Sequence, residues 1–235
     1  MLLIVTDAHL LPGSARNDDF RAMLRAISAS PHDVLFLGDI MELWMAIPRY
    51  ETPEHAAFLE WCRSESARRK VFFVEGNHEF QVSAEHRDCF TEVAVESMIL
   101  GDCLFCHGAC IQEPPWGITR LLLRFFRTRF VNVVLRIVPG GSTIINTFKR
   151  LLGSNGKYRN APVVPEQKIR RWLSAVKRRN PNLKLCFLGH FHTGKSLAVE
   201  SLDCHIIPPW KESQEILLLD TTRETFTLSP WKALL

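Results

Sequence analysis

The sequence lacks the features that would carry it into or across a membrane. No apolar run reaches the length of a membrane-spanning helix without interruption by charges. The N-terminus also lacks the basic region and apolar stretch of a secretory signal, because the apolar residues 2–5 lead almost directly into Asp7 and His9. We therefore expect a cytoplasmic protein.

Disulfide bonds are not expected either. The seven cysteines are an odd number and lie mostly in apolar runs, which in a reducing cytoplasm favours small buried side chains. The stretch Cys103-Leu104-Phe105-Cys106-His107 matches the attachment pattern of c-type haem. That attachment requires export, for which the sequence has no signal, so we do not expect haem.

Acidic residues are almost absent from one segment. From Trp116 to Arg179 the sequence has fifteen Lys and Arg residues but a single acid, Glu166. This segment carries a charge of about +14 and the rest of the chain about −10, although the net charge is only +4. The basic segment is suited to an anionic partner, and the acidic remainder is suited to cations.

The apolar pattern predicts an α/β fold. Helical spacing covers Asp18–Ala29, Glu54–Arg69 and Glu166–Arg179. Buried or alternating strands are expected at Leu2–Thr6, Asp33–Leu37, Val71–Val74, Val93–Leu100, Cys103–Cys106, Leu183–Leu188, Ser196–Leu202, Cys204–Ile207, Glu215–Leu219 and Thr225–Leu228. The first strands alternate with helices, which favours a parallel sheet, and the last strands follow one another directly. We expect a single domain, residues 1–235, in which two sheets pack face to face with helices outside.

The basic segment interrupts this alternation, and residues 116–160 form a predicted helical insertion within the domain. Apolar residues with interspersed arginines predict one helix over Ile118–Val138, and Ser142 could cap a second helix that extends to Leu152. Two interpretations stay open. The helices could pack on the body with solvated arginines. They could instead form a lid whose apolar face meets acyl chains or a membrane surface while its arginines meet phosphates.

Polar residues follow five of the predicted strands at their carboxyl ends, where α/β sheets place their sites. They are Asp7, His9, Asp39, Asn77, His78, His107, His190 and His192. Each alone could be a helix cap, a turn residue or a hydrogen-bonded core histidine. Independent structural residues, however, have no reason to recur at the same end of five strands. Carboxylate, amide and imidazole ligands suit two divalent ions such as Mn, Fe, Zn, Co or Ni, and two such metals can clamp the oxygens of a phosphoryl displacement.

The spacing of these residues resembles the signature blocks of the calcineurin-like metallophosphoesterases. The blocks occur in the family order as Asp7-x-His9, Gly38-Asp39, Gly76-Asn77-His78-Glu79, His107-Gly108 and Gly189-His190-x-His192. The resemblance implies a four-layer α/β/β/α sandwich. It implies that Asp7, His9 and His192 bind one metal, that Asn77, His107 and His190 bind a second, and that Asp39 bridges them. It also implies catalytic roles for Asn77 and His78.

A closer resemblance is to the UDP-2,3-diacylglucosamine hydrolases, the pyrophosphatases of lipid A synthesis. It rests on Gly38-Asp39-Ile40-Met41-Glu42-Leu43-Trp44, on the arginine-rich insertion after His107-Gly108, and on Pro209-Trp210-Lys211-Glu212-Ser213 before an apolar strand. The resemblance implies a manganese enzyme at the inner membrane face that acts on a lipid-linked phosphoester, producing UMP and an acylated sugar phosphate.

One block departs from that closer family, in which the third block reads Gly-Asn-Arg-Asp. Here it reads Gly-Asn-His-Glu, and in the wider superfamily a histidine at the position of His78 protonates a departing alkoxide. The departure admits another phosphomonoester or phosphodiester as substrate. A nuclease is also conceivable, but the basic segment is rich in Leu, Val and Phe and poor in Tyr, so we do not expect a nucleic acid partner.

Two other functions were weighed. Residues 189–196 also match the P-loop pattern Gly-x-x-x-x-Gly-Lys-Ser, which would require a helix directly after Lys195 and Ser196. The residues that follow favour a strand instead. A non-catalytic scaffold with this fold is the other alternative, and the retention of all seven candidate ligands argues against it.

Overall fold

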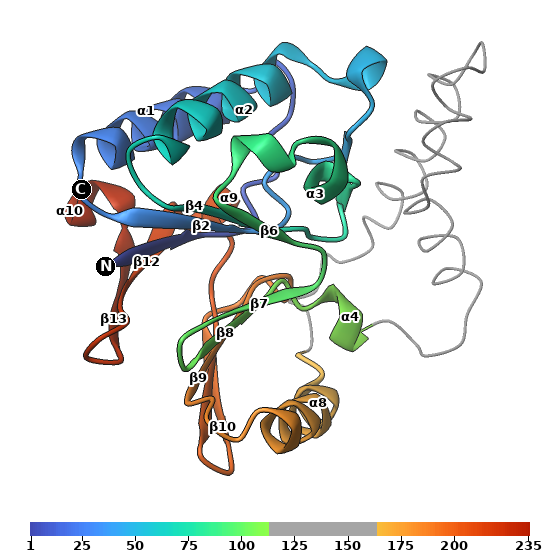
Figure 1. Cartoon of the computed structure of the whole chain (residues 1–235), viewed down its shortest axis with the longest axis vertical. Coiled ribbons are helices and arrows are strands. Elements are labelled where there is room, and N and C mark those ends of the chain that lie inside the picture. The colour runs from blue at the N-terminus through green and yellow to red at the C-terminus, as the bar shows by residue number, and fades with distance from the viewer. Residues whose placement is uncertain (113–163) are drawn as a thin grey trace.

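Two β-sheets lie face to face with helices on their outer sides in the computed structural model, which describes residues 1–112 and 164–235 (Figure 1). The strand order is β13-β12-β1-β2-β4-β6 in the first sheet and β10-β11-β9-β8-β7 in the second. The layers form the expected four-layer α/β/β/α sandwich.

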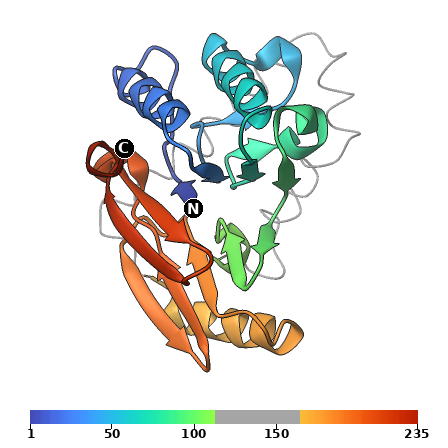
Figure 2. The ribbon, with the colours of Figure 1, turned by 60° about the vertical axis from the view of Figure 1, so that its left-hand side comes forward.

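The first sheet has a parallel body and an antiparallel edge. Its parallel strands are β1 (Leu2–Val5), β2 (Asp33–Leu37), β4 (Val71–Val74) and β6 (Glu92–Ala94). β12 (Glu215–Asp220) pairs antiparallel with β1, and β13 (Thr225–Pro230) pairs antiparallel with β12. Helices α1 (Arg16–Ala29) and α2 (Pro53–Ser66) cover its outer face (Figure 2).

The second sheet is also mixed. A hairpin joins β7 (Ser97–Leu100) to β8 (Cys103–Cys106), and β8 lies parallel to β9 (Leu185–Leu188). β11 (Leu202–Ile206) lies parallel to β9 and antiparallel to β10 (Lys195–Val199). Helix α8 (Glu166–Arg179) covers the outer face through Ile169 and Leu173, which are fully buried.

Strand alternation explains why the sheets stack. Successive side chains of a strand point to opposite faces, so in β1 Leu3 and Val5 face the outer helices while Leu2 and Ile4 face the second sheet. Between the sheets, the rings of Phe105 and Phe187 stack with centroids 5.5 Å apart. Burial of these apolar side chains supplies the main stabilisation of the sandwich.

Short elements complete the described chain. They are β3 (Trp44–Met45), β5 (Glu79–Phe80), α3 (Val82–Glu85), α4 (Ala109–Gln112), α9 (Trp210–Ser213), α10 (Trp231–Leu234) and two 3₁₀ turns at Pro48–Tyr50 and Arg87–Cys89. Strands β3 and β5 pair with each other outside the two large sheets. Within residues 1–112 and 164–235, no helix is long and apolar enough to cross a membrane.

The predicted strand Val93–Leu100 is wrong as one element. The chain forms β6 in the first sheet and then crosses to the second sheet as β7, with exposed Val95 and Glu96 between them. An apolar run shows that residues are buried but not which sheet buries them. The C-terminal strands divide for the same reason, because β12 and β13 join the first sheet rather than extending β10 and β11.

Six of the cysteines are buried thiols and Cys110 is half-buried, as expected for apolar side chains in a reducing environment. Cys103 faces the other sheet, whereas Cys106 faces α8 on the opposite side of β8. The haem pattern therefore has its two cysteines on opposite faces of one strand. The helical insertion predicted at residues 116–160 lies outside the described residues.

Removal of the stacked ring between the sheets is expected to destabilise the fold. Phe187→Ala should lower the free energy of unfolding by about 3–5 kcal/mol, because it opens a cavity where Phe187 contacts Phe105. Leu11→Ala, in an exposed loop, should change it by no more than about 0.5 kcal/mol. Urea denaturation measures both, and equal values for the two variants would contradict a core between the sheets.

Candidate metal centre

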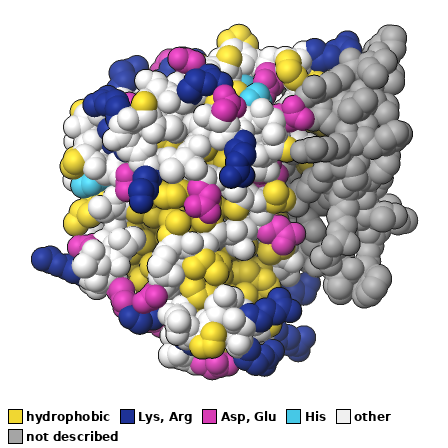
Figure 3. Space-filling model, in the orientation of Figure 1, with side chains coloured by type: hydrophobic (Ala, Val, Ile, Leu, Met, Phe, Trp, Pro, Cys, Tyr) yellow, Lys and Arg dark blue, Asp and Glu magenta, His cyan; other side chains and the backbone are white. Residues whose placement is uncertain are grey.

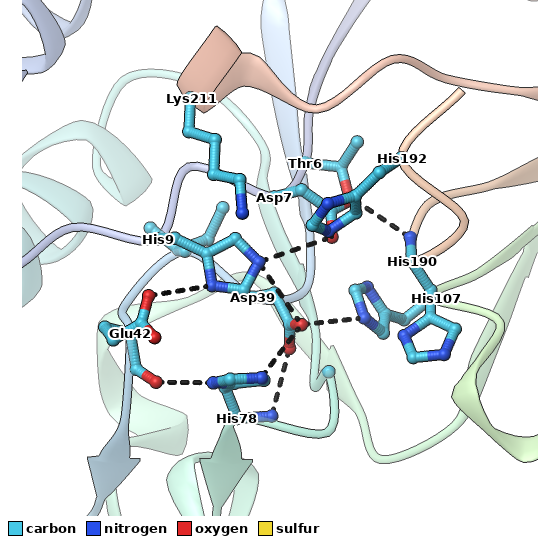
Figure 4. A network of polar contacts seen from close by, with 12 residues as sticks. Thr6, Asp7, His9, Asp39, Glu42, His78, His107, His190, His192 and Lys211 are labelled. Carbon is cyan, nitrogen blue, oxygen red and sulfur yellow. Dashed lines mark hydrogen bonds and ion pairs between the residues drawn. The ribbon is translucent and has the colours of Figure 1, made fainter. Parts of the chain in front are cut away.

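The carboxyl ends of strands from both sheets meet at one place (Figure 4). β1 leads to Asp7 and His9, β2 to Asp39, β8 to His107, and β9 to His190 and His192. Backbone hydrogen bonds join the first two loops, since the Asp7 N–H donates to the Gly38 carbonyl at 3.1 Å and the His9 N–H to that of Asp39 at 3.0 Å. The candidate ligands therefore lie on loops held against one another.

Five candidate ligands have left-handed backbone conformations, which are uncommon for residues other than glycine. The φ angles are 52° for Asp7, 44° for His9, 52° for Asp39, 65° for His190 and 49° for His192. Conformations of this kind are strained and gather at functional sites, where the surrounding structure holds them. The turns bring side chains from several strands to a common centre.

Gly38 is required by the closeness of these loops. Its φ is +77°, and a Cβ atom there would lie 2.6 Å from His107 Nδ1 and 2.8 Å from the Gly76 Cα. Contacts below 3.0 Å could not be tolerated without displacement of the backbone or of the imidazole. The glycine before Asp39 thus permits the β2, β4 and β8 ends to approach.

Two buried carboxylates occupy the centre. Asp7 is 0 % exposed and Asp39 is 2 % exposed, and each lies among imidazoles. Oδ2 of Asp39 is 3.2 Å from Nε2 of His107, and its Oδ1 accepts a hydrogen bond from the His78 N–H at 3.0 Å. Burial alone would raise the pKa of Asp39, but His107 and the other imidazoles hold that pKa well below its usual value.

Asp7 is held in a similar way. Its Oδ2 accepts a hydrogen bond from the His190 N–H at 3.0 Å and lies 2.7 Å from the Thr6 hydroxyl. Its Oδ1 is 3.2 Å from Nε2 of His192 and 3.8 Å from Nε2 of His9. Among the described residues, every ion-pair partner of Asp7 and Asp39 is an imidazole rather than a lysine or arginine.

His107 fits a metal ligand. Its Nδ1 lies 2.9 Å from the Leu37 carbonyl and must donate to it, so Nε2 faces Asp39. Burial would lower the pKa of His107, but the Asp39 and Asp7 carboxylates raise it to about 10. In the protein alone, Nε2 of His107 therefore carries a proton. A metal bound at this nitrogen would replace that proton, because metal ligands must be deprotonated.

Unpaired polar atoms support the same interpretation. Oδ1 of Asn77 is buried and has no hydrogen-bond partner within residues 1–112 and 164–235, and buried Nε2 of His107 has only its 3.2 Å ion-pair contact with Asp39. Such groups are costly unless something satisfies them. Asp7, His9 and His192 each offer a ligand atom within 4.8 Å of the other two, and so do Asp39, His107 and His190. This oxygen and nitrogen donor set is suited to divalent metals.

His190 is in the form that binds a metal. Burial, followed by the positive charge of His107, lowers the pKa of His190 to about 4, so its imidazole is neutral. Its Nε2 lies 2.8 Å from Oε1 of Gln112 at the end of α4 and donates to it. Nδ1 is then left as the acceptor. Gln112 could not be selected from the sequence, because its contact with His190 joins residues 78 positions apart.

Glu79 is a second residue of the site whose role could not be predicted from the sequence. Its carboxylate is fully buried and accepts backbone hydrogen bonds at 2.8 Å from Asp39, Ile40 and Gly76. Burial and the nearby Asp39 carboxylate raise the pKa of Glu79 to about 7. Glu79 therefore ties the loop after β2 to the loop after β4 and so sets the position of Asp39.

The P-loop alternative fails on local structure. Lys195 begins strand β10, whereas a P-loop requires a helix at this position. The ammonium of Lys195 pairs with Glu166 of α8 on the surface. The motif that contains His190 and His192 is therefore the turn from β9 to β10.

Glu79→Gln is expected to destabilise the protein although it changes a single atom. One carboxylate oxygen becomes an NH₂ group, which cannot accept the backbone N–H bonds that reach it, and a buried unpaired donor costs about 1–3 kcal/mol. The exposed Glu60→Gln is the control and should cost no more than about 0.5 kcal/mol. Thermal denaturation compares the two variants. The same Tm in both would rule out a stabilising role for the hydrogen bonds between Glu79 and the backbone.

Several solved structures are similar to this chain at low sequence identity. Among solved structures, the chain is similar to an archaeal phosphodiesterase, with 10 % identity over 97 % of both chains and a TM-score of 0.49. It is similar to Vps29 of Entamoeba histolytica in complex with zinc, with 14 % identity over 97 % of this chain and 89 % of that chain (TM-score 0.43). Nuclease MPE of Pseudomonas putida matches at 20 % identity over 43 % of this chain and 51 % of that chain (TM-score 0.30).

No curated protein matches the sequence. A family model does, and it is described as calcineurin-like phosphoesterase. The match runs over residues 1–194 and includes every candidate ligand from Asp7 to His192. With the two-sheet sandwich and the carboxylate and imidazole cluster in place, the chain belongs to the calcineurin-like phosphoesterase family.

Proposed function

We propose that this protein is a hydrolase with two divalent metals that cleaves a phosphoester or pyrophosphate. The observation that carries the proposal is the burial of Asp7 and Asp39 among imidazoles, with no lysine or arginine partner among the described residues. Buried carboxylates require compensating positive charge. Divalent metals held there would polarise the phosphoryl group and provide a water acidic enough to attack it.

Each candidate ligand has a proposed role. Asp7, His9 and His192 would hold one metal and Asn77, His107 and His190 the other, with Asp39 between them. The short contacts from the Leu37 carbonyl to His107 and from Gln112 to His190 support these roles, because they orient the imidazoles. Manganese is the proposed metal on the family resemblance.

His78 is the proposed proton donor to the leaving oxygen. Its Nδ1 donates to the Glu42 carbonyl, and its Nε2 lies 3.8 Å from Oδ2 of Asp39. Burial would lower the pKa of His78, but the Asp39 carboxylate, the hydrogen bond to the Glu42 carbonyl and the nearby glutamates together raise that pKa above its usual value. The protonated form of His78 is therefore favoured at the edge of the metal centre, as general-acid catalysis needs.

The proposed substrate is UDP-2,3-diacylglucosamine, hydrolysed to UMP and the acylated sugar phosphate. The Gly38–Trp44 block and the arginine-rich composition of residues 116–160 support it. Lys and Arg side chains also gather over α8 (Figure 3), where Lys168, Arg171 and Arg178 are exposed. A basic surface favours the anionic cytoplasmic face of a membrane, where such a substrate would lie.

A second candidate is a phosphodiesterase or phosphomonoesterase acting on another substrate. His78 favours it, because protonation of the leaving group matters more for an alkoxide than for a phosphate. The same metal centre would serve both reactions. The two proposals differ in the group that leaves.

Hydrolysis assays with Mn²⁺ separate these proposals. After removal of metals with EDTA, Mn²⁺ is expected to restore release of UMP from UDP-2,3-diacylglucosamine, measured by chromatography, and Asp39→Ala should stay at background. Bis-p-nitrophenyl phosphate is the small-diester comparison. If only the diester is cleaved, the lipid substrate is wrong. If Mn²⁺ restores neither reaction, the protein is not this enzyme.

Lys211 is expected to help bind the phosphate of the substrate. Its backbone N–H donates to the Asp7 carbonyl at 3.2 Å, and its side chain extends toward His9 (Figure 4). Burial would raise the pKa of Glu42, whereas His9 and, more weakly, the charges of His78 and Lys211 lower it.

Lys211→Ala should therefore raise KM about 10-fold with a smaller change in kcat, as loss of one charge-assisted hydrogen bond predicts. The surface variant Lys195→Ala removes the lysine of the P-loop-like motif and should leave KM unchanged. Steady-state kinetics measure KM and kcat for both variants and for the wild type. An unchanged KM in Lys211→Ala would remove this lysine from the substrate site.

A further inference from the structure

Glu42 lies between two imidazoles of the candidate centre and is not among its predicted ligands. It follows Asp39 in the loop between β2 and β3, and its side chain is 42 % exposed. The Glu42 N–H donates to the Leu10 carbonyl at 3.0 Å, and the Leu10 N–H donates to that of Ile40 at 2.9 Å. These two bonds fix the backbone of Glu42 against the loop that carries His9.

The carboxylate of Glu42 contacts the outer nitrogen of His9. Oε2 of Glu42 lies 3.2 Å from Nδ1 of His9, and Nε2 of His9 lies 3.7 Å from Asp39 and 3.8 Å from Asp7 (Figure 4). The contact is an ion pair, and because a carboxylate can only accept, it favours a proton on Nδ1. Nε2 then faces the two buried carboxylates, where a metal would take the place of its proton.

The backbone of the same residue contacts the second imidazole. The Glu42 carbonyl accepts a hydrogen bond from Nδ1 of His78, which leaves Nε2 of His78 facing Asp39. The two rings stand edge to face with centroids 4.9 Å apart. One residue thus contacts Nδ1 of both imidazoles and turns Nε2 of each toward the buried carboxylates, through its carboxylate for His9 and through its carbonyl for His78.

We propose that Glu42 is a positioning residue that orients His9 toward its metal while its backbone orients the proton donor His78. The part of this proposal that concerns metal binding by His9 rests on the proposed function. Removal of such an outer partner from a ligating histidine weakens metal binding about 10- to 100-fold. The hydrogen bond from His78 to the Glu42 carbonyl involves only the backbone of Glu42 and is kept when the side chain is changed. Side-chain variants therefore test the effect on His9 separately from the effect on His78.

A rival interpretation is that Glu42 is itself a metal ligand. His9, Glu42 and His78 offer ligand atoms within 4.8 Å of one another. However, Nδ1 of His78 is engaged by the Glu42 carbonyl, and Nδ1 of His9 by the Glu42 carboxylate. The rival predicts one metal more than the two of the proposed centre.

The first test is Mn²⁺ binding followed by isothermal titration calorimetry on the full chain. The wild type should bind two ions. Glu42→Ala should weaken one of them about 10- to 100-fold and leave the other unchanged. Glu42→Gln keeps an acceptor oxygen for Nδ1 and should stay within a few-fold of the wild type. Glu60 is an exposed glutamate on α2, and the control variant Glu60→Ala should bind both ions with the affinities of the wild type.

The second test needs no metal. Imidazole ¹⁵N NMR of the metal-free protein should show that Nδ1 of His9 carries a proton in the wild type and in Glu42→Gln, and that this tautomer preference is lost in Glu42→Ala. The signals of His78 should be unchanged in all three proteins. An unchanged His9 tautomer in Glu42→Ala would overturn the inference.

The two tests fail separately. If the wild type binds no Mn²⁺, the proposed function is wrong, and the His9 tautomer still decides whether Glu42 positions the ring. If the wild type binds three ions and Glu42→Ala binds two, Glu42 is a ligand and the positioning role is wrong. If Glu42→Gln binds as weakly as Glu42→Ala, the charge and not the hydrogen bond matters, which also contradicts positioning.

Discussion

Two carboxylates are buried where the two sheets meet, and the arrangement of the rest of the centre depends on this burial. Asp7 and Asp39 are almost inaccessible to water and lie within 3.8 Å of four imidazoles, those of His9, His78, His107 and His192. An ionised carboxylate is costly in such a place unless positive charge accompanies it. In the protein alone, protonated histidine supplies that charge, and the family chemistry would replace it with metal ions.

The scaffold around the carboxylates is made of backbone more than of side chains. Main-chain N–H groups of His78 and His190 bond to Asp39 and Asp7, and Glu79 in turn holds the backbone at Asp39. The left-handed turns at the candidate ligands store strain that these bonds must hold. The centre is therefore preorganised by hydrogen bonds that cross between loops, which is the arrangement that precise ligand geometry requires.

The sequence predicted the layers, most strands and helices, and the strand ends at which the candidate ligands lie. These features follow from local patterns such as the continuous apolar run Leu2–Val5 and the position of Asp39 just after an apolar strand. It could not predict Gln112 or the ties of Glu42 and Glu79, because they depend on side chains that meet across loops. The sequence also predicted β6 and β7 as one strand, because an apolar residue pattern does not show which of the two sheets buries it. Metal binding by the predicted ligands stays a proposal.

The pairing of β1 with β12 has a consequence for how the molecule forms. Leu3 lies opposite Leu218, so the strand that leads to Asp7 and His9 has β2 on one side and the distant β12 on the other. β1 therefore keeps one open edge until β12, which follows the whole second sheet in the sequence, is in place. Such long-range pairing is slow to form and leaves a strand edge exposed meanwhile. The loop that contains Asp7 and His9 is accordingly supported on both sides only when distant parts of the sequence have met.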